Sequence, residues 1–272
     1  MSVNPNQALW EKGDFTRIAR AMRESGDALV EGLAIAAGMK VLDLGCGDGT
    51  TALPAARRGA DVLGVDIARN LVDAGNARAK AAGLSNCSFR HGDASDLAGI
   101  ADRSFDLVVS MFGAMFAPRP FDVAKEAVRV TRPGGRIVMG NWIPNDPTVV
   151  AQILRISSAY AAPPPEGFVS PMTWGVPANV VERFAGAGVP ADRINCAPDR
   201  YRFDYDCAPA AVVELFRDYY GPTMNAFAAA QANGKAADLQ RELTQLFERL
   251  NLSEVPGTTR FDATFLKVIV TV

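Results

Sequence analysis

Residues 41–51 read Val-Leu-Asp-Leu-Gly-Cys-Gly-Asp-Gly-Thr-Thr, an apolar run that ends in three alternating glycines. The apolar run is typical of a buried strand, and the small residues after it are typical of a helix start. Glycine at every second position lets the backbone adopt positive φ, and it leaves main-chain N–H groups open to a ligand. The stretch therefore predicts a strand, a tight loop and a helix, with the loop as a cradle for a cofactor.

The order of the glycines separates two classes of cofactor. Dinucleotide-binding folds use G-x-G-x-x-G, whose third glycine brings the helix close to a pyrophosphate. Gly45 and Gly47 fit that pattern, but Thr50 stands at the third position and Gly49 is additional. Asp43, just before the glycines, would place a negative charge beside the ligand. This arrangement suits a cationic ligand better than a phosphate.

A carboxylate ends the second predicted strand, which covers residues 61–66. Asp66 at this position can accept hydrogen bonds from both hydroxyls of a ribose, as an acid does in dinucleotide-binding folds. Its alternative role is to cap the next helix, which the pattern places at residues 71–82. Because the glycine cradle precedes it, we favour the ribose role for Asp66.

Charge and composition exclude several function classes. The 28 basic and 30 acidic residues give a formal net charge of -2 and are well mixed, which predicts neither a nucleic-acid nor a membrane partner. The four cysteines lack the spacing of a zinc or redox motif, so we expect reduced thiols and no metal site. The N-terminus shows no signal pattern and no apolar run reaches membrane length, so we expect a cytoplasmic protein.

The pattern D-x-G-x-G-x-G at residues 43–49 resembles the first motif of class I S-adenosylmethionine-dependent methyltransferases. Arg-Pro-Gly-Gly at residues 132–135, before a fifth strand, is very common in that class. The resemblance covers residues 41–142 and is greatest to the quinone-methyltransferase-like small-molecule branch. It implies an α/β fold: a Rossmann-like, seven-stranded, mostly parallel sheet with an antiparallel last strand, helices on both faces, and a helical insertion before that strand.

The same resemblance implies S-adenosylmethionine as the cofactor. In the family, the acid at the position of Asp93 meets the exocyclic amine of adenine, and the N–H of Ala94 can donate to a ring nitrogen. Asp96 competes for that role, while His91 is expected far from the methyl group and not as a base. The predicted cofactor-binding residues are Asp43, Gly45, Cys46, Gly47, Gly49, Asp66, Ile67, Asp93, Ala94, Ser110 and Met111.

The residues after the fourth strand indicate the kind of acceptor. Family members that methylate adenine or glutamine nitrogens carry Pro-Pro-Tyr or Pro-Pro-Phe there, whereas this chain has Ser110-Met111-Phe112. The difference argues against those acceptors, and the apolar, sulfur-rich lining favours a small hydrophobic molecule. The predicted substrate contacts are Trp10, Phe112, Phe116, Trp142, Tyr219 and Tyr220.

Two helical segments are expected to flank the acceptor. At the N-terminus, an amphipathic helix after Asp14, ended by Gly26, would form a lid with Trp10; alternatively, Trp10 packs on the domain surface. Residues 208–251 form the insertion, whose paired tyrosines look like a tip over the pocket. The alternative is that the insertion extends the core or makes a homodimer contact.

We therefore predict methyl transfer to an oxygen, nitrogen or carbon of a small acceptor by a single domain. Its parts are an N-terminal helical segment (1–38), a cofactor-binding core (39–142) and a substrate-side half (143–272). No base is obvious, and in-line transfer can depend mainly on positioning, so we name no catalytic residue. Tyrosines are candidates only if one faces the methyl group: Tyr160, Tyr205, Tyr219 and Tyr220. The alternatives are an NAD(P)-dependent oxidoreductase and a non-enzymatic S-adenosylmethionine-binding protein.

Overall fold

A seven-stranded sheet forms the centre of the computed structural model, which describes residue 4, residues 6–164 and residues 166–272. The strands are β1 (Lys40–Leu44), β2 (Asp61–Asp66), β3 (Cys87–His91), β4 (Phe105–Met111), β5 (Thr131–Trp142), β6 (Ile194–Tyr205) and β7 (Thr259–Thr271). Their order in the sheet is β3-β2-β1-β4-β5-β7-β6. The first five strands run parallel, and β7 lies between β5 and β6, antiparallel to both.

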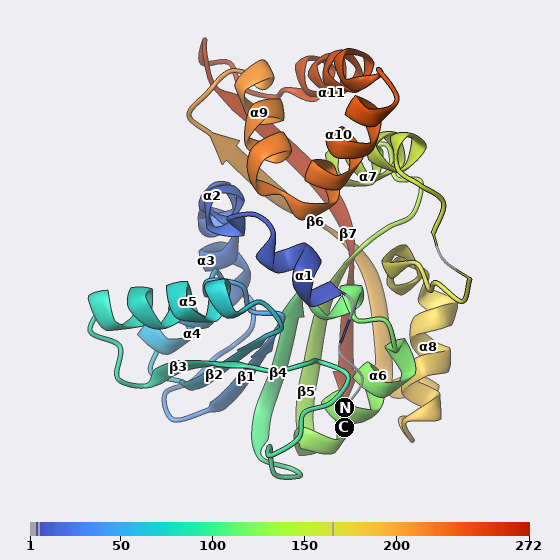
Figure 1. Ribbon diagram of the computed structural model, residues 1–272. Helices are drawn as coiled ribbons and strands as arrows, with labels where there is room; N and C mark the ends of the chain where they lie inside the picture. The colour runs from blue at the N-terminus through green and yellow to red at the C-terminus, as the bar shows by residue number, and fades with distance from the viewer. Residues whose placement is uncertain (1–3, 5, 165) are drawn as a thin grey trace.

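Helices cover both faces of the sheet and one end of it (Figure 1). The α-helices are α1 (Asn6–Glu11), α2 (Phe15–Ala19), α3 (Arg23–Glu31), α4 (Ala52–Arg57), α5 (Arg69–Ala81), α6 (Pro120–Val130), α7 (Val149–Tyr160), α8 (Pro177–Gly186), α9 (Pro209–Tyr219), α10 (Gly221–Ala232) and α11 (Ala236–Leu250). The 3-10 helices are η1 (Arg20–Met22), η2 (Ala114–Phe116), η3 (Pro171–Gly175) and η4 (Ala191–Arg193). None of these described helices is both long and apolar enough to cross a membrane.

Alternate residues of each central strand enter different apolar clusters, because successive side chains of a strand point to opposite faces. On β4, Leu107 and Val109 pack in a cluster with α3, α4 and α5, whereas Val108 packs in the cluster that contains α6 and α8. All three side chains are buried. A parallel strand buried on both faces reads as a continuous apolar run, which is why the sequence located these strands.

The predicted seven-stranded fold with an antiparallel last strand is confirmed. The insertion between β6 and β7 consists of α9, α10 and α11, and Figure 1 shows these helices gathered with α7 at one end of the long strands. We call α7 and α9–α11 the helical cap. The Tyr160 hydroxyl donates a 2.6 Å hydrogen bond to Glu242 and so ties α7 to α11.

One local prediction is wrong. Gly26 does not end a helix, because it lies inside α3. A Cβ at this position would lie 2.6 Å from the carbonyl oxygen of Thr50, so the glycine allows α3 to pack directly on the backbone of the glycine-rich loop. Close packing thus explains a residue that the sequence pattern suggested as a helix stop.

Candidate active site

The glycine-rich loop after β1 has the predicted positive φ angles: 65° at Gly45, 54° at Gly47 and 90° at Gly49. At Gly45 a Cβ would also lie 2.5 Å from the Cα of Gly113, so the loops after β1 and β4 meet backbone to backbone. The N–H of Gly45 donates to the carbonyl of Val65 at 2.8 Å, which ties the loop to the end of β2. Three strand ends are thereby held together.

Asp66 connects two parts of this site. Its Oδ2 accepts a 2.8 Å hydrogen bond from the N–H of Gly47, and its Oδ1 accepts a 2.9 Å bond from the N–H of Ala68. Burial raises the pKa of the Asp66 carboxyl, and these two N–H groups oppose that rise. The residue at the N-cap of α5 is Ala68, so Asp66 supports the turn without being the cap itself. Each carboxylate oxygen retains a lone pair for a ligand.

A first cavity opens beside this loop and encloses about 730 Å³ out to its mouth. Seven predicted cofactor residues line the cavity: Gly45, Gly47, Asp66, Ile67, Asp93, Ala94 and Met111. The structure brings these residues together, although whether they bind a cofactor stays a prediction.

Four other predicted cofactor residues do not line the first cavity. The Ser110 hydroxyl donates to the carbonyl of Leu44 at 2.7 Å, so it holds strands together. Gly49 lies against Leu53 and Phe89, and a Cβ there would come 2.3 Å from Leu53 Cδ1. Asp43 and Cys46 are also buried away from the cavity. These four residues therefore hold the structure around the loop and do not line the first cavity.

Asp43 is a buried carboxylate with an unsatisfied oxygen. It is 2% exposed, and its Oδ2 has no hydrogen-bond partner among the described residues. Burial and the nearby Asp66 raise the pKa of Asp43 to about 8, against the opposing effect of the Ala52 N–H. Near neutral pH this carboxyl is therefore mainly protonated in the protein alone.

Asp93 lies at the opposite side of the first cavity and is held by neighbours. Its Oδ1 accepts hydrogen bonds from the N–H and the hydroxyl of Ser95, at 2.8 and 2.7 Å. Its Oδ2 accepts a 2.9 Å bond from the Asn4 side chain. These donors fix the carboxylate beside Ala94, where both residues face the cavity.

The N-terminal segment closes over the first cavity. The Asn6 amide donates to the carbonyl of Phe116 at 2.6 Å, and Glu11 accepts from the N–H of Arg69 at 3.0 Å. Asn4, Asn6 and Trp10 all line the cavity. Trp10 was predicted at this site, whereas the two asparagines were missed because no local sequence pattern marks them.

A second cavity of about 490 Å³ adjoins the first. Both cavities are lined by the same five side chains: Trp10, Phe15, Met22, Phe112 and Phe116. The remaining walls of the second cavity come from helix α2, from the sheet and from the helical cap. They comprise Ile18, Trp142, Val150, Ile153, Leu154, Phe203, Phe216 and Tyr220.

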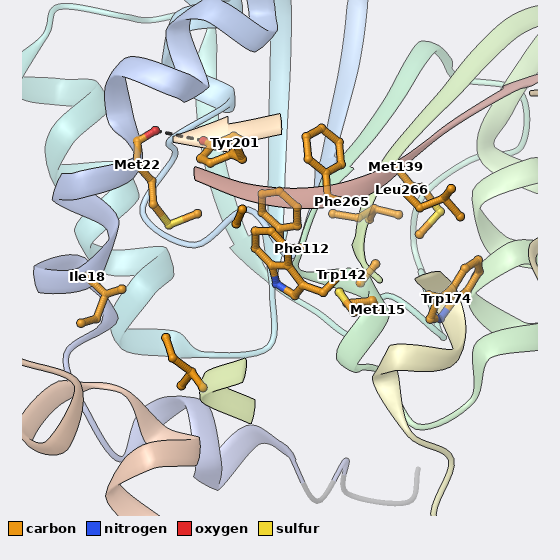
Figure 2. Packing of buried hydrophobic residues seen from close by; sticks show 14 of the residues in the cluster. Ile18, Met22, Phe112, Met115, Met139, Trp142, Trp174, Tyr201, Phe265 and Leu266 are labelled. Carbon is orange, nitrogen blue, oxygen red and sulfur yellow. Dashed lines mark hydrogen bonds between the residues drawn. The ribbon is translucent and has the colours of Figure 1, made fainter. Parts of the chain in front are cut away.

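Phe112 stands between the two cavities in an unusual backbone conformation. Its φ is 62°, which is rare for a residue with a large side chain. Its ring stacks on Trp142 with 3.7 Å between centroids and 8° between planes, and Figure 2 shows the stack beside Tyr201 and Phe265. The N–H of Phe112 also donates to the carbonyl of Gly140 at 3.0 Å. Packing therefore holds the strained residue in place.

The paired tyrosines of the cap have different surroundings. Tyr220 is buried, lines the second cavity, and packs against Trp10 with ring centroids 6.0 Å apart. Tyr219 lines neither cavity, and its ring lies under the Arg17 guanidinium at 5.6 Å. Tyr160 and Tyr205 line neither cavity either. Of the four tyrosines considered as bases, only Tyr220 is placed to meet an acceptor.

Comparisons with known proteins agree with this architecture. The family described as "Methyltransferase domain" matches residues 42–139. The uncharacterized protein Rv1405c of Mycobacterium tuberculosis is 32% identical over 243 residues, which cover 89% of this chain and 86% of that protein. Methyltransferase GfsG of Streptomyces halstedii is 37% identical over 143 residues, covering 52% of this chain and 51% of that one.

Solved structures share the fold. The crystal structure of a putative methyltransferase from Bacillus halodurans C-125 superimposes with a TM-score of 0.57 at 15% identity. The match covers 90% of this chain and 97% of that chain. At this level of identity the likeness concerns the fold alone.

Proposed function

The chain belongs to the class I S-adenosylmethionine-dependent methyltransferase family, and we propose that it methylates a small, hydrophobic organic acceptor. The observation that carries the proposal is the pair of adjoining cavities with shared walls. The first has the glycine loop and two fixed carboxylates, and the second is almost wholly apolar. Adjoining cavities allow a methyl donor and an acceptor to be held next to each other.

The residues of the first cavity fit S-adenosylmethionine. Asp66 has lone pairs free for ribose hydroxyls, and the loop at Gly47 leaves open the space that a side chain would fill. Asp93 and Ala94 together offer an acceptor and a backbone donor for the edge of an adenine. When bound, S-adenosylmethionine supplies an electrophilic methyl group on a positively charged sulfur.

A nicotinamide dinucleotide fits less well. The third glycine of the dinucleotide pattern is Thr50, which lies half-buried against α3 at Gly26. Gly49 packs against Leu53 and Phe89 and does not line the first cavity. The cavity also presents the two carboxylates, of Asp66 and Asp93, where a pyrophosphate would add further negative charge.

In this proposal, the protein's part in the transfer is to position the two reactants. Phe112 and Met111 lie at the end of β4, where they separate the two cavities, and Trp10 covers both from the N-terminal segment. Rigid walls that hold two reactants in line convert a bimolecular reaction into an effectively unimolecular one. This positioning can lower the activation free energy by several kcal/mol. This proposal needs no nucleophilic side chain.

Calorimetric titration tests the choice of cofactor. We expect S-adenosylmethionine and S-adenosylhomocysteine to bind and NAD not to bind. Binding of NAD without a response to either sulfur ligand would refute the methyltransferase proposal in favour of an oxidoreductase.

A second measurement separates an enzyme from a protein that only binds the cofactor. S-adenosylhomocysteine release would be followed with a panel of phenols, quinones, amines and acids. We expect release with at least one apolar acceptor. Tight cofactor binding without release for any member of the panel would favour the non-enzymatic alternative.

A further inference from the structure

The second cavity contains no charged side chain. Its lining, as far as the structure describes it, consists of aliphatic, sulfur-containing and aromatic residues. The polar atoms these residues carry are the indole N–H groups of Trp10 and Trp142 and the hydroxyl of Tyr220. The two indole groups only donate hydrogen bonds, so the described lining is uncharged and its few polar groups are mainly donors.

This lining discriminates against charged acceptors. An ammonium or carboxylate group that enters loses its hydration, and an apolar wall returns no opposite charge. Even after the protein relaxes around the ion, this desolvation penalty stays large. An oxygen atom, in contrast, can accept hydrogen bonds from the available donors.

The walls also favour a flat molecule. Phe112 and Trp142 present a stacked pair of rings, and Trp10 meets Phe116 edge-on with 4.9 Å between centroids. Aromatic rings pack well against such walls in offset or edge-to-face arrangements, which add to the stabilisation from area burial.

Titratable groups around the second cavity are few. Tyr220 is the one described residue in the lining that can ionise, and burial raises its pKa, which makes it a poor base. Asp66 and Asp93 line the first cavity but not the second, and both already accept hydrogen bonds from the chain. Asp43 is buried and lines neither cavity. None of these carboxylates lines the wall against which an acceptor would lie.

We propose that the second cavity binds a flat aromatic hydroxyl compound, uncharged except at its reacting oxygen, whose hydroxyl loses its proton to solvent without a protein base. The inference rests on the proposed methyltransferase function. The oxygen lone pair forms the new C–O bond while the C–S bond breaks, and sulfur keeps that electron pair as a neutral thioether. Tyr220 is a positioning residue in this proposal: it is buried, it lines the second cavity, and its hydroxyl donates to the acceptor oxygen.

Direct binding tests the selectivity without turnover. The probes are 2-naphthol, 2-naphthoate and 2-naphthylmethylammonium, titrated calorimetrically with and without S-adenosylhomocysteine. We expect 2-naphthol to bind at least roughly tenfold more tightly than either charged probe, the equivalent of about 1.4 kcal/mol. Equal or tighter binding of a charged probe would overturn the proposal. Because this titration also runs without cofactor, its result is separate from a failure of the cofactor to bind.

A cavity-filling variant shows where 2-naphthol binds. Leu154 is half-buried on α7 and lines only the second cavity, so Leu154→Trp should weaken 2-naphthol binding roughly tenfold and leave the Kd of S-adenosylhomocysteine unchanged. Ser158→Trp, at an exposed position on the same helix, is the matched control and should change neither. Unchanged 2-naphthol binding in Leu154→Trp would refute this site.

The pH dependence of turnover tests the missing base. With 4-nitrophenol and with phenol as acceptors, the midpoint of the rise in kcat/KM should move with the acidity of the acceptor. A midpoint that stays at one pH for both acceptors would reveal a protein base and overturn the proposal.

Variants of the paired tyrosines test the positioning role. Tyr220→Phe should raise the acceptor KM roughly tenfold without moving the midpoints, whereas Tyr219→Phe should leave KM unchanged. Equal effects of the two variants would remove the positioning role.

Discussion

Replacing Asp43 by asparagine should make the stability of the protein less sensitive to pH. Asp43 is the last but one residue of β1, is 2% exposed, and has its pKa raised to about 8, first by burial and then by the nearby Asp66. In the unfolded chain an aspartate has a pKa of about 3.9. Between these values the folded protein binds a proton that the unfolded chain has released.

The sign and size of the effect follow from that difference. The proton stabilises the fold fully below about pH 3.9, and the stabilisation is lost as pH rises towards about 8. The loss is at most about 1.4 kcal/mol per pH unit, or about 3 kcal/mol between about pH 5.5 and about pH 7.5. Asparagine is similar in size and binds no proton, so Asp43→Asn should gain about that much relative to the wild type over this interval.

Urea unfolding of both proteins at the two pH values measures the difference. Each pH needs its own wild-type curve, because other groups also titrate, and the effect of interest is the change in the wild-type-minus-variant difference. Asp61→Asn, at an exposed position at the start of β2, is the control and should give a constant difference. If Asp43→Asn also gave the same difference at both pH values, the carboxyl would not be held protonated by burial.

Two further predictions concern the first cavity. Gly45→Ala should prevent stable folding, since its Cβ would lie 2.5 Å from the Gly113 backbone, whereas Gly47→Ala should cost only about 1 kcal/mol for its positive φ; equal losses in urea unfolding would contradict this reasoning. Asp66→Asn should weaken binding of S-adenosylhomocysteine about ten- to hundredfold, while Asp96→Asn, exposed and outside the cavity, should change Kd little. Calorimetric titration measures the Kd of both variants, and equal small changes in Kd would place the ribose away from Asp66.

The sheet and the glycine loop could be predicted because their signals are local. Most of the parallel strands contain a short apolar run, and the loop's glycines are contiguous with β1. Asp66 and Asp93 could be found because Asp66 is the last residue of β2 and Asp93 lies two residues after the end of β3. Parallel strands place their carboxyl ends at one edge of the sheet, so residues after different strands converge without further information. The family's quinone-related branch stays a prediction.

Other parts of the site depend on contacts between distant segments. The bond from Asn4 to Asp93 spans 89 residues, and that from Asn6 to Phe116 spans 110. An asparagine side chain carries no periodic or compositional signal for such a partner. Asp43 illustrates a different limit: its position in the motif was recognised, but the sequence could not show that its side chain is buried and does not line the cavity.

The two cavities therefore differ in what determines them. The first is built from loops that follow β1, β2, β3 and β4, so its chemistry is set by short motifs that a protein can keep while the rest of its sequence changes. The second draws its walls from α2, β5, β6, α7, α9 and the segment around Tyr220, which only the folded helical cap brings together. We infer that substitutions in the cap change acceptor binding without disturbing the strand ends that form the proposed cofactor site. On this proposal acceptor identity depends on tertiary packing, and variants such as Leu154→Trp test it more directly than any sequence motif does.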